Sequence, residues 1–258
     1  MKLHVLAMVL LALATPAMAQ QQDARCPDRL QAGGSTDRAR PLVVLVETEP
    51  WAMVIGSDSP RFALYSDGLV IYRHGREYRS VRLGDEERRV LLASLDVENL
   101  ACFTGNHGNT AVTDQPFHNL FLGRGGSLSL VSVYGARFDP SAVPPPVAAA
   151  NARLSAFDHP GAHTWLPERI EVMIWPYEYA PDASIDWPAD WPGLNSEHAV
   201  RRGDGYSIFV PAADRERLIA FLGTRRERGA VRIGGSKWAA STRLPFPMER
   251  MWMRPGTE

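Results

Sequence analysis

Paired runs of aromatic and β-branched residues, joined by short glycine-containing turns, constrain the fold of this chain more than any other feature. The clearest pair is Phe62–Tyr65 and Leu69–Tyr72, with Ser66-Asp67-Gly68 between the two runs. Glycine supplies the positive φ that a tight turn needs, so Asp-Gly in this position indicates a β-hairpin. Two further pairs predict hairpins in the same way: Phe117–Leu122 with Leu128–Tyr134, and Ala230–Ile233 with Trp238–Arg243.

Three segments have the apolar spacing and the start signals of a helix. One begins after Gly84-Asp85 with acidic residues in its first turn, one follows Pro144-Pro145-Pro146, and one runs from Asp214 to Leu222. Hairpins with about three helices favour an α+β fold with antiparallel sheets over a parallel, doubly wound sheet. Single strands are predicted at Leu42–Glu47, Trp51–Ile55, Tyr78–Leu83, Ile170–Trp175 and Tyr206–Val210.

A strand followed by a short cap, a charged first turn and an apolar helix end occurs twice in the chain. The two occurrences are Tyr78–Leu95 and Tyr206–Leu222, on either side of the proline run. This repetition is consistent with two similar α+β halves. We therefore predict an N-terminal half at 41–143 and a C-terminal half at 144–258, the latter with an irregular Trp- and Pro-rich loop at 176–195.

The first nineteen residues have the three parts of a secretory signal peptide. Lys2 and His4 form a short basic start, which an unbroken apolar run, Val5–Thr15, follows. Ala17-Met18-Ala19 then places small side chains where signal peptidase requires them. As a helix, the apolar run covers only about half of a ~30 Å hydrocarbon core, so no membrane span is expected after cleavage. The sequence predicts a signal peptide at 1–19 and a periplasmic or secreted protein.

The charge of the remaining chain is close to zero. Residues 1–19 contain one basic residue, Lys2, and no acidic one, so 27 basic and 29 acidic residues remain, a net charge of −2. A nearly neutral surface gives no general electrostatic attraction to nucleic acid or to anionic lipid. We therefore expect no nucleic-acid partner.

Two cysteines remain after cleavage, and in an oxidising compartment an even pair indicates a disulfide. Cys26 lies in a polar, Gly- and Ser-containing stretch, residues 20–40, that we expect to be a flexible leader. A Cys26–Cys102 bond would tie this leader to the folded body. It would stabilise the fold by roughly 4–5 kcal/mol by restricting the unfolded chain. The alternative is two free thiols.

One stretch of the chain, residues 60–103, combines the clearest hairpin with the start of the first helix. Its pattern is Phe62-x-Leu64-Tyr65-x-Asp67-Gly68-x-Val70-Ile71-Tyr72, followed by a strand and by Gly84-Asp85-Glu86-Glu87. In this stretch the chain resembles exported bacterial domains that are known only as proteins of unknown function. The resemblance implies export and an α+β fold, and it brings no catalytic residue with it.

Four histidines lie in polar, loop-like stretches and are candidate metal ligands. Two of them occur four residues apart, a spacing that would place both imidazoles on one face of a helix, as zinc sites require. Pro160 and Gly161 stand between these two and predict a turn, so histidines exposed on a turn are the alternative interpretation. No cofactor is otherwise expected. The four candidates are His107, His118, His159 and His163.

Six of the seven tryptophans lie between Trp165 and Trp252, and two of these fall in the irregular loop 176–195 beside aspartates. Exposed tryptophans beside carboxylates could form a platform for sugar rings or a hot spot for a protein partner. The alternative is that the rings are buried and pin a compact loop to the body. The candidate partner-binding residues are Trp187, Trp191, Asp186 and Asp190.

No motif for a serine nucleophile is present, and Gly229–Ser236 lacks the lysine of a phosphate loop at the required place. Two hypotheses for function follow. The favoured one is a non-enzymatic envelope protein that binds another envelope protein or a cell-wall glycan through residues 176–195. The alternative is a periplasmic hydrolase that uses the four loop histidines, with or without a metal. A scaffold with no small ligand is a third interpretation.

Overall fold

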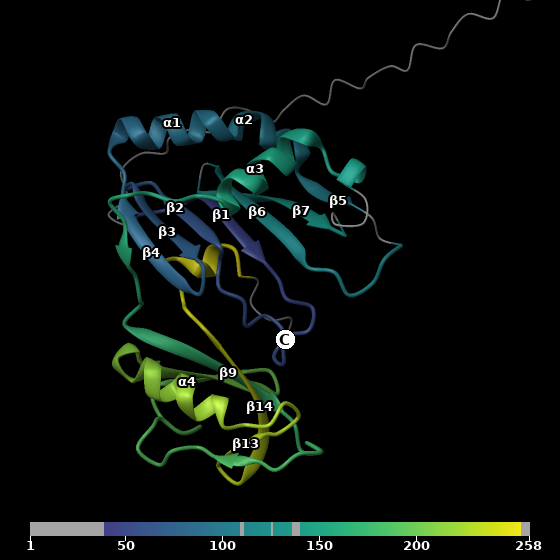
Figure 1. Ribbon diagram of the computed structural model, residues 1–258, viewed down its shortest axis with the longest axis vertical. Helices are drawn as coiled ribbons and strands as arrows, with labels where there is room; N and C mark the ends of the chain where they lie inside the picture. The colour runs from purple at the N-terminus through teal and green to yellow at the C-terminus, as the bar shows by residue number, and fades with distance from the viewer. Residues whose placement is uncertain (1–38, 109–110, 125, 136–139, 254–258) are drawn as a thin grey trace, which may run out of the picture.

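The computed structural model describes residues 39–108, 111–124, 126–135 and 140–253. The predicted signal peptide, all but the end of the predicted leader, and Cys26 lie outside these residues, so the Cys26–Cys102 bond stays a prediction. Fourteen strands within the described ranges form two sheets, which Figure 1 shows as separate layers one above the other. Three α-helices cover one face of the upper sheet, and a fourth packs on the lower sheet. The fold is therefore α+β.

The first sheet contains β1 (Pro41–Glu47), β2 (Phe62–Tyr65), β3 (Leu69–His74), β4 (Glu77–Arg82), β5 (Gly105–Gly108), β6 (Phe117–Arg124), β7 (Ser127–Tyr134) and β8 (His163–Thr164). The order across the sheet is β5-β7-β6-β1-β2-β3-β4-β8. The predicted hairpins are confirmed as β2–β3, where Phe62 is opposite Tyr72, and β6–β7, where Phe117 is opposite Tyr134.

The second sheet contains β9 (Arg169–Pro176), β10 (Ile185–Asp186), β11 (Ala199–Arg202), β12 (Gly205–Pro211), β13 (Val231–Ile233) and β14 (Ser236–Arg243). Its order is β10-β13-β14-β9-β12-β11. The third predicted hairpin is confirmed as β13–β14, with Val231 opposite Trp238. The predicted strands at Ile170–Trp175 and Tyr206–Val210 are confirmed as the antiparallel neighbours β9 and β12.

Both sheets are mixed, so the prediction of purely antiparallel sheets is wrong. The pairs β5–β7 and β10–β13 are parallel. Both β5 and β10 are short edge strands that reach the sheet through irregular chain, whereas a hairpin pattern reports only pairing between neighbours in sequence. The predicted strand at Trp51–Ile55 is also wrong, because these residues form turns in the β1–β2 connection.

Four α-helices occur among the described residues: α1 (Asp85–Leu95), α2 (Val97–Leu100), α3 (Pro145–Ser155) and α4 (Arg215–Gly223). The predicted start of α1 is confirmed, because the Glu87 carboxylate accepts the Gly84 N–H at 2.9 Å and three acidic residues occupy the first turn. No helix in the described part of the chain is long and apolar enough to cross a membrane. The 3₁₀ turns are η1 (Ala101–Phe103), η2 (Pro140–Ala142), η3 (Ala212–Asp214) and η4 (Glu249–Met251).

The chain passes from the first sheet to the second between β8 and β9, not at the predicted boundary of residue 144. The proline run opens α3, and α3 buries Val147, Ala150 and Leu154 in the core of the first sheet. After β14 the chain returns, and Phe246 and Trp252 pack on the opposite face of the first sheet (Figure 1, yellow). The first unit thus comprises the described residues up to 165 together with 244–253, and the second unit comprises 169–243.

Candidate functional site

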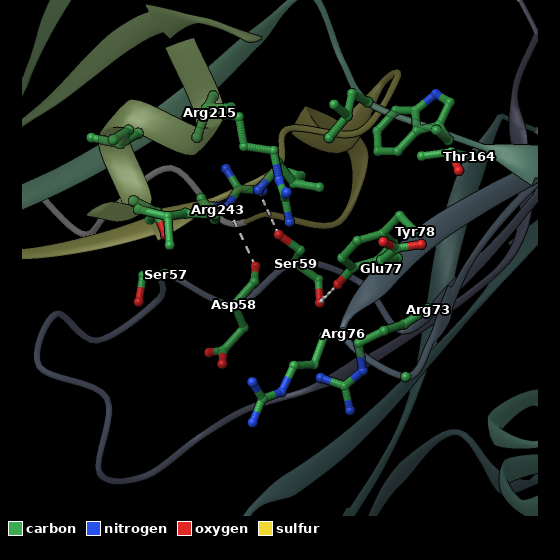
Figure 2. Close-up of a pocket in the computed structure, with 18 of the residues that line it drawn as sticks. Ser57, Asp58, Ser59, Arg73, Arg76, Glu77, Tyr78, Thr164, Arg215 and Arg243 are labelled. Atoms are coloured by element: carbon green, nitrogen blue, oxygen red, sulfur yellow. Dashed lines mark hydrogen bonds between the residues drawn. The ribbon is translucent and has the colours of Figure 1, made fainter. Parts of the chain in front are cut away.

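A cleft of about 460 Å³ lies between the two units (Figure 2). The first unit lines it with Ser57–Ser59 of the β1–β2 connection, with the β3–β4 hairpin and with Thr164–Leu166. The second unit lines it with β9, the start of α4 and the end of β14. Because both units supply walls, the cleft exists only while the two units are packed together.

The β3–β4 hairpin places one charged side chain at its tip, facing the second unit. His74 pairs with Glu77 across the ladder, which leaves Gly75 and Arg76 as a two-residue turn. Gly75 has φ +62°, a conformation that tight hairpins need and that glycine adopts without strain. The turn therefore presents Arg76 to the cleft, in which Figure 2 shows it beside Arg73.

Arg243, at the end of β14, anchors the back of the cleft in a buried ion network. Its guanidinium is 1% exposed and donates hydrogen bonds to Glu171 of β9 and to Glu249 of η4. Its Nε donates to the carbonyl oxygen of Asp58 at 3.3 Å (Figure 2). Burial alone would lower the pKa of Arg243, but the hydrogen bonds and charges of the two glutamates raise it overall. The network links both sides of the cleft.

Glu171 at the centre of this network is fully buried, and its partners come from three strands. Besides Arg243, it accepts hydrogen bonds from Ser207 of β12 and from Arg202 of β11 at 3.2 Å. A buried carboxylate is tolerated only when charge and hydrogen bonds compensate for its lost hydration. The face of the second sheet that points toward the first unit is therefore polar here, and mutual hydrogen bonds fix the positions of its charged side chains.

Four charged groups in the cleft have no ion-pair partner among the residues that the structure describes. No carboxylate of the described residues lies within 4.0 Å of the guanidinium groups of Arg76 and Arg215, and no cation lies within that distance of Asp58 and Glu77. Arg73 differs from these, because its guanidinium is 3.4 Å from Glu47. Two positive and two negative groups thus face the cleft without an ion-pair partner in the described part of the chain.

Asp58 is half-buried, as is Arg215, whereas Arg76 and Glu77 are exposed. One of its carboxylate oxygens accepts the Glu49 N–H at 3.0 Å. Burial raises the pKa of the Asp58 carboxyl, and the nearby charge of Glu49 adds to the rise, although the Glu49 N–H and the charge of Arg243 oppose it. The charged form of Asp58 is therefore disfavoured in this position, and a cation from outside the protein would relieve the cost.

Comparison with known proteins adds no further information on this site. No protein-family model, curated protein or solved structure matches the chain. The geometry of the cleft is therefore the basis for an assignment of function.

The two tryptophans of loop 176–195 are packed into the second unit. Trp191 is 6% exposed, and its ring lies 5.0 Å from that of Trp187 and 5.5 Å from that of Phe221 on α4. The Trp187 indole N–H donates to the carbonyl oxygen of Pro192 at 3.0 Å. The rings therefore serve as core side chains of the second unit, and the face of Trp191 is not open to a partner.

The two aspartates of the same loop have partners within the protein. Arg217 of α4 pairs with both carboxylate oxygens of Asp190 and lies 4.8 Å over the Trp191 ring. The hydrogen bond from Arg217 lowers the pKa of Asp190. Arg232 pairs with Asp186 at 2.9 Å. These contacts hold the loop against α4 and β13.

The four candidate metal ligands are not brought together, because they lie on β5, on β6, in a turn and on β8. In the described ranges, no group of three or more His, Cys, Asp or Glu side chains is placed to hold a metal ion. Each ring lies near a different group: His107 near the Phe103 carbonyl oxygen at 2.7 Å, His118 near Glu47 at 3.7 Å, His159 near Glu87 at 3.6 Å, and His163 near Ser80 at 3.2 Å.

The cleft residues Arg76, Arg215, Asp58 and Glu77 were not predicted from the sequence. One local signal was available, since Gly75-Arg76 between two strand-like runs marks a hairpin tip. Nothing local indicates that this tip faces the start of α4, because the two segments meet only through the packing of the two units.

Proposed function

We propose that this chain is an exported, non-enzymatic binding protein and that its ligand occupies the cleft between the two units. The main support is the cleft itself, a space of about 460 Å³ with four charged groups that have no ion-pair partner within the described ranges. Small-molecule sites commonly lie between domains, where a few convergent polar groups orient a ligand. The export part of the proposal depends on the signal-peptide pattern of residues 1–19.

The cleft is a better candidate than the two sites suggested by the sequence. Loop 176–195 uses its tryptophans in the core and its aspartates in ion pairs, so its groups are already engaged. The hydrolase alternative depends on His107, His118, His159 and His163, and all four rings lie outside the lining of the cleft. No observation on the described residues favours that alternative over ligand binding.

The test is to fill the cleft and measure whether ligand-induced stabilisation disappears. Ile219 lies on the rim, on α4, with 52% of its surface exposed, so Ile219→Trp should add bulk to the cleft without disturbing the core. Val90 on α1 is 53% exposed and outside the cleft, and Val90→Trp is the matched control. A ligand that binds only the folded state raises its melting temperature.

Thermal melts are recorded with a panel of small molecules and soluble cell-wall fragments. We expect at least one compound to stabilise the unchanged protein and the Val90→Trp variant, and to lose this effect with Ile219→Trp. If every stabilising compound acts equally on all three proteins, its site is elsewhere and the proposal is wrong.

A further inference from the structure

The first sheet has one face that its helices do not cover. Residues of β6 and β7 that belong to the core beneath the helices are Leu120, Leu122, Val131 and Val133. Figure 1 shows α1, α2 and α3 together on that side of the sheet. Because side chains alternate along a strand, the residues between these four point to the opposite face.

The C-terminal segment covers part of this opposite face. Phe246 and Trp252 pack in one cluster with Phe121 of β6 and Leu128 of β7. Phe117 lies on the same side of β6, four residues before Phe121, and is 43% exposed. The end of the face at Phe117 is therefore open to solvent.

An aromatic row crosses the strands at this open end. Phe117 lies opposite Tyr134 of β7, with ring centroids 4.6 Å apart and 40° between the ring planes. On its other side Tyr134 lies opposite Gly108 of β5, which has no side chain to cover the ring. The Tyr134 hydroxyl accepts the Gln115 N–H at 3.3 Å, which fixes the ring in place. The two rings thus form a preformed apolar surface.

A polar row crosses the same three strands about 6.7 Å farther along, the rise of two residues in a strand. Asn119 of β6 lies opposite Ser132 of β7, and Ser132 lies opposite Asn106 of β5. The Ser132 hydroxyl donates to the side-chain oxygen of Asn119 at 2.7 Å. Among the described residues, the NH₂ group of Asn119 and the exposed side chain of Asn106 have no hydrogen-bond partner. Amide groups are therefore available beside the aromatic row.

The combination of the two rows matches the chemistry of a sugar. A pyranose ring with equatorial substituents has flat C–H faces and a rim of hydroxyl groups. Aromatic rings bury such apolar faces, and side-chain amides both donate to and accept from hydroxyl groups. The six residues of the two rows are all uncharged, so they provide no electrostatic attraction for a charged ligand.

We propose that this open face binds a neutral oligosaccharide of β-1,4-linked sugars. One sugar ring stacks on Phe117 and Tyr134, and hydroxyl groups of the same or the next sugar bond to Asn119 and Asn106. An apolar protein surface is a poorer match, because it would bury the amides without hydrogen bonds. None of these residues lines the cleft, so the inference goes beyond the proposed function and can fail independently of it.

The probes are cellotriose and triacetylchitotriose, two neutral β-1,4-linked trisaccharides. Binding to the purified full chain is measured by isothermal titration calorimetry. We expect at least one trisaccharide to bind and Phe117→Ala to weaken it at least about tenfold, because the stacking surface is lost. Tyr179→Ala is the matched control, since Tyr179 is an aromatic residue of the second unit that is 97% exposed, and it should leave binding unchanged.

A second variant tests the polar row. Asn106→Ala changes an exposed side chain on an edge strand and should weaken the same trisaccharide about fivefold, because hydrogen bonds to hydroxyl groups are lost. Asn99→Ala is the control, at an exposed position of α2 on the helix side of the sheet, and should not alter binding. Thermal melts check that all four variants remain folded.

The outcomes separate this inference from the proposed function. If neither trisaccharide binds, or if binding is unchanged in Phe117→Ala or in Asn106→Ala, the assignment to this face is wrong. If binding is retained in Phe117→Ala and lost in Ile219→Trp, the sugar occupies the cleft, which supports the proposed function and overturns this inference.

Sedimentation velocity tests whether a second copy of the chain occupies the face instead. We expect Phe117→Ala and the unchanged protein to have the same oligomeric state. If Phe117→Ala dissociates an oligomer and neither trisaccharide binds, the face is an interface between copies of the chain and the inference is wrong.

Discussion

Burial of Asp58 has an electrostatic cost that its neighbours in the folded protein compensate only in part. Burial raises the pKa of its carboxyl in the folded state, so folding favours the protonated form relative to the unfolded chain. The contribution of this group to stability is therefore most favourable below about pH 4 and is lost as pH rises through the folded-state pKa. Asp58→Asn should raise the melting temperature at pH 7, with a difference that vanishes near pH 3.

Asp67 is the control, because its pKa is shifted in the direction opposite to that of Asp58. Its pKa is lowered overall, because the hydrogen bonds from Arg82 and the Leu69 N–H outweigh the opposing effect of burial. Its stabilising contribution is present above the unfolded-state pKa and is lost as pH falls through the folded-state pKa. Asp67→Asn should therefore lower the melting temperature at pH 7. Thermal melts from pH 3 to pH 8 check both variants, and a destabilised Asp58→Asn protein at pH 7 would contradict the first expectation.

At the scale of elements, the packing of α4 against loop 176–195 makes Trp191 a core residue. Trp191→Ala should destabilise the chain by about 3–5 kcal/mol, the usual cost of removing a large buried aromatic side chain. Trp51, which is 74% exposed, is the matched control, and Trp51→Ala should change stability by less than about 0.5 kcal/mol. Urea unfolding measures both. If both variants lose the same free energy of unfolding, burial of the Trp191 ring does not stabilise the fold and the prediction is wrong.

The elements that were predictable from the sequence are those with local causes. The β2–β3 hairpin follows from Asp67-Gly68, and α1 follows from Gly84 with its acidic first turn. Trp51–Ile55 has the composition of a strand, but its backbone forms turns and buries Val54 against the second sheet, where the Val54 N–H donates to the Ser241 hydroxyl at 3.2 Å. Contacts between distant segments override local preference there.

The candidate site was not predictable for the same reason. Its charged groups belong to a loop, a hairpin tip and a helix start that are far apart in sequence. The tryptophans and histidines are rare residues that cluster along the chain, but clustering in sequence does not indicate whether their side chains meet or are exposed. The site instead depends on how two separately formed units pack.

At the scale of the whole molecule, packing of the two units depends on Arg243, because its guanidinium joins the second sheet to η4 and its Nε joins it to the β1–β2 connection. Arg243→Met should destabilise the chain by about 3 kcal/mol, the lower end of the range for a broken buried pair, since Glu171 would still keep Arg202 and Ser207.

A second substitution separates the cost of an unpaired charge from the loss of a contact. Arg243→Met combined with Glu171→Leu should recover most of the loss, because no carboxylate is then left buried without its main partner. Arg232→Met is the control: it removes one arginine from an exposed pair with Asp186, for which about 0–1 kcal/mol is expected. Urea unfolding gives all three values. If Arg243→Met costs no more than Arg232→Met, the buried network does not hold the two units together, and other contacts between them, such as the hydrogen bond from the Val54 N–H to the Ser241 hydroxyl, must fix the walls of the cleft.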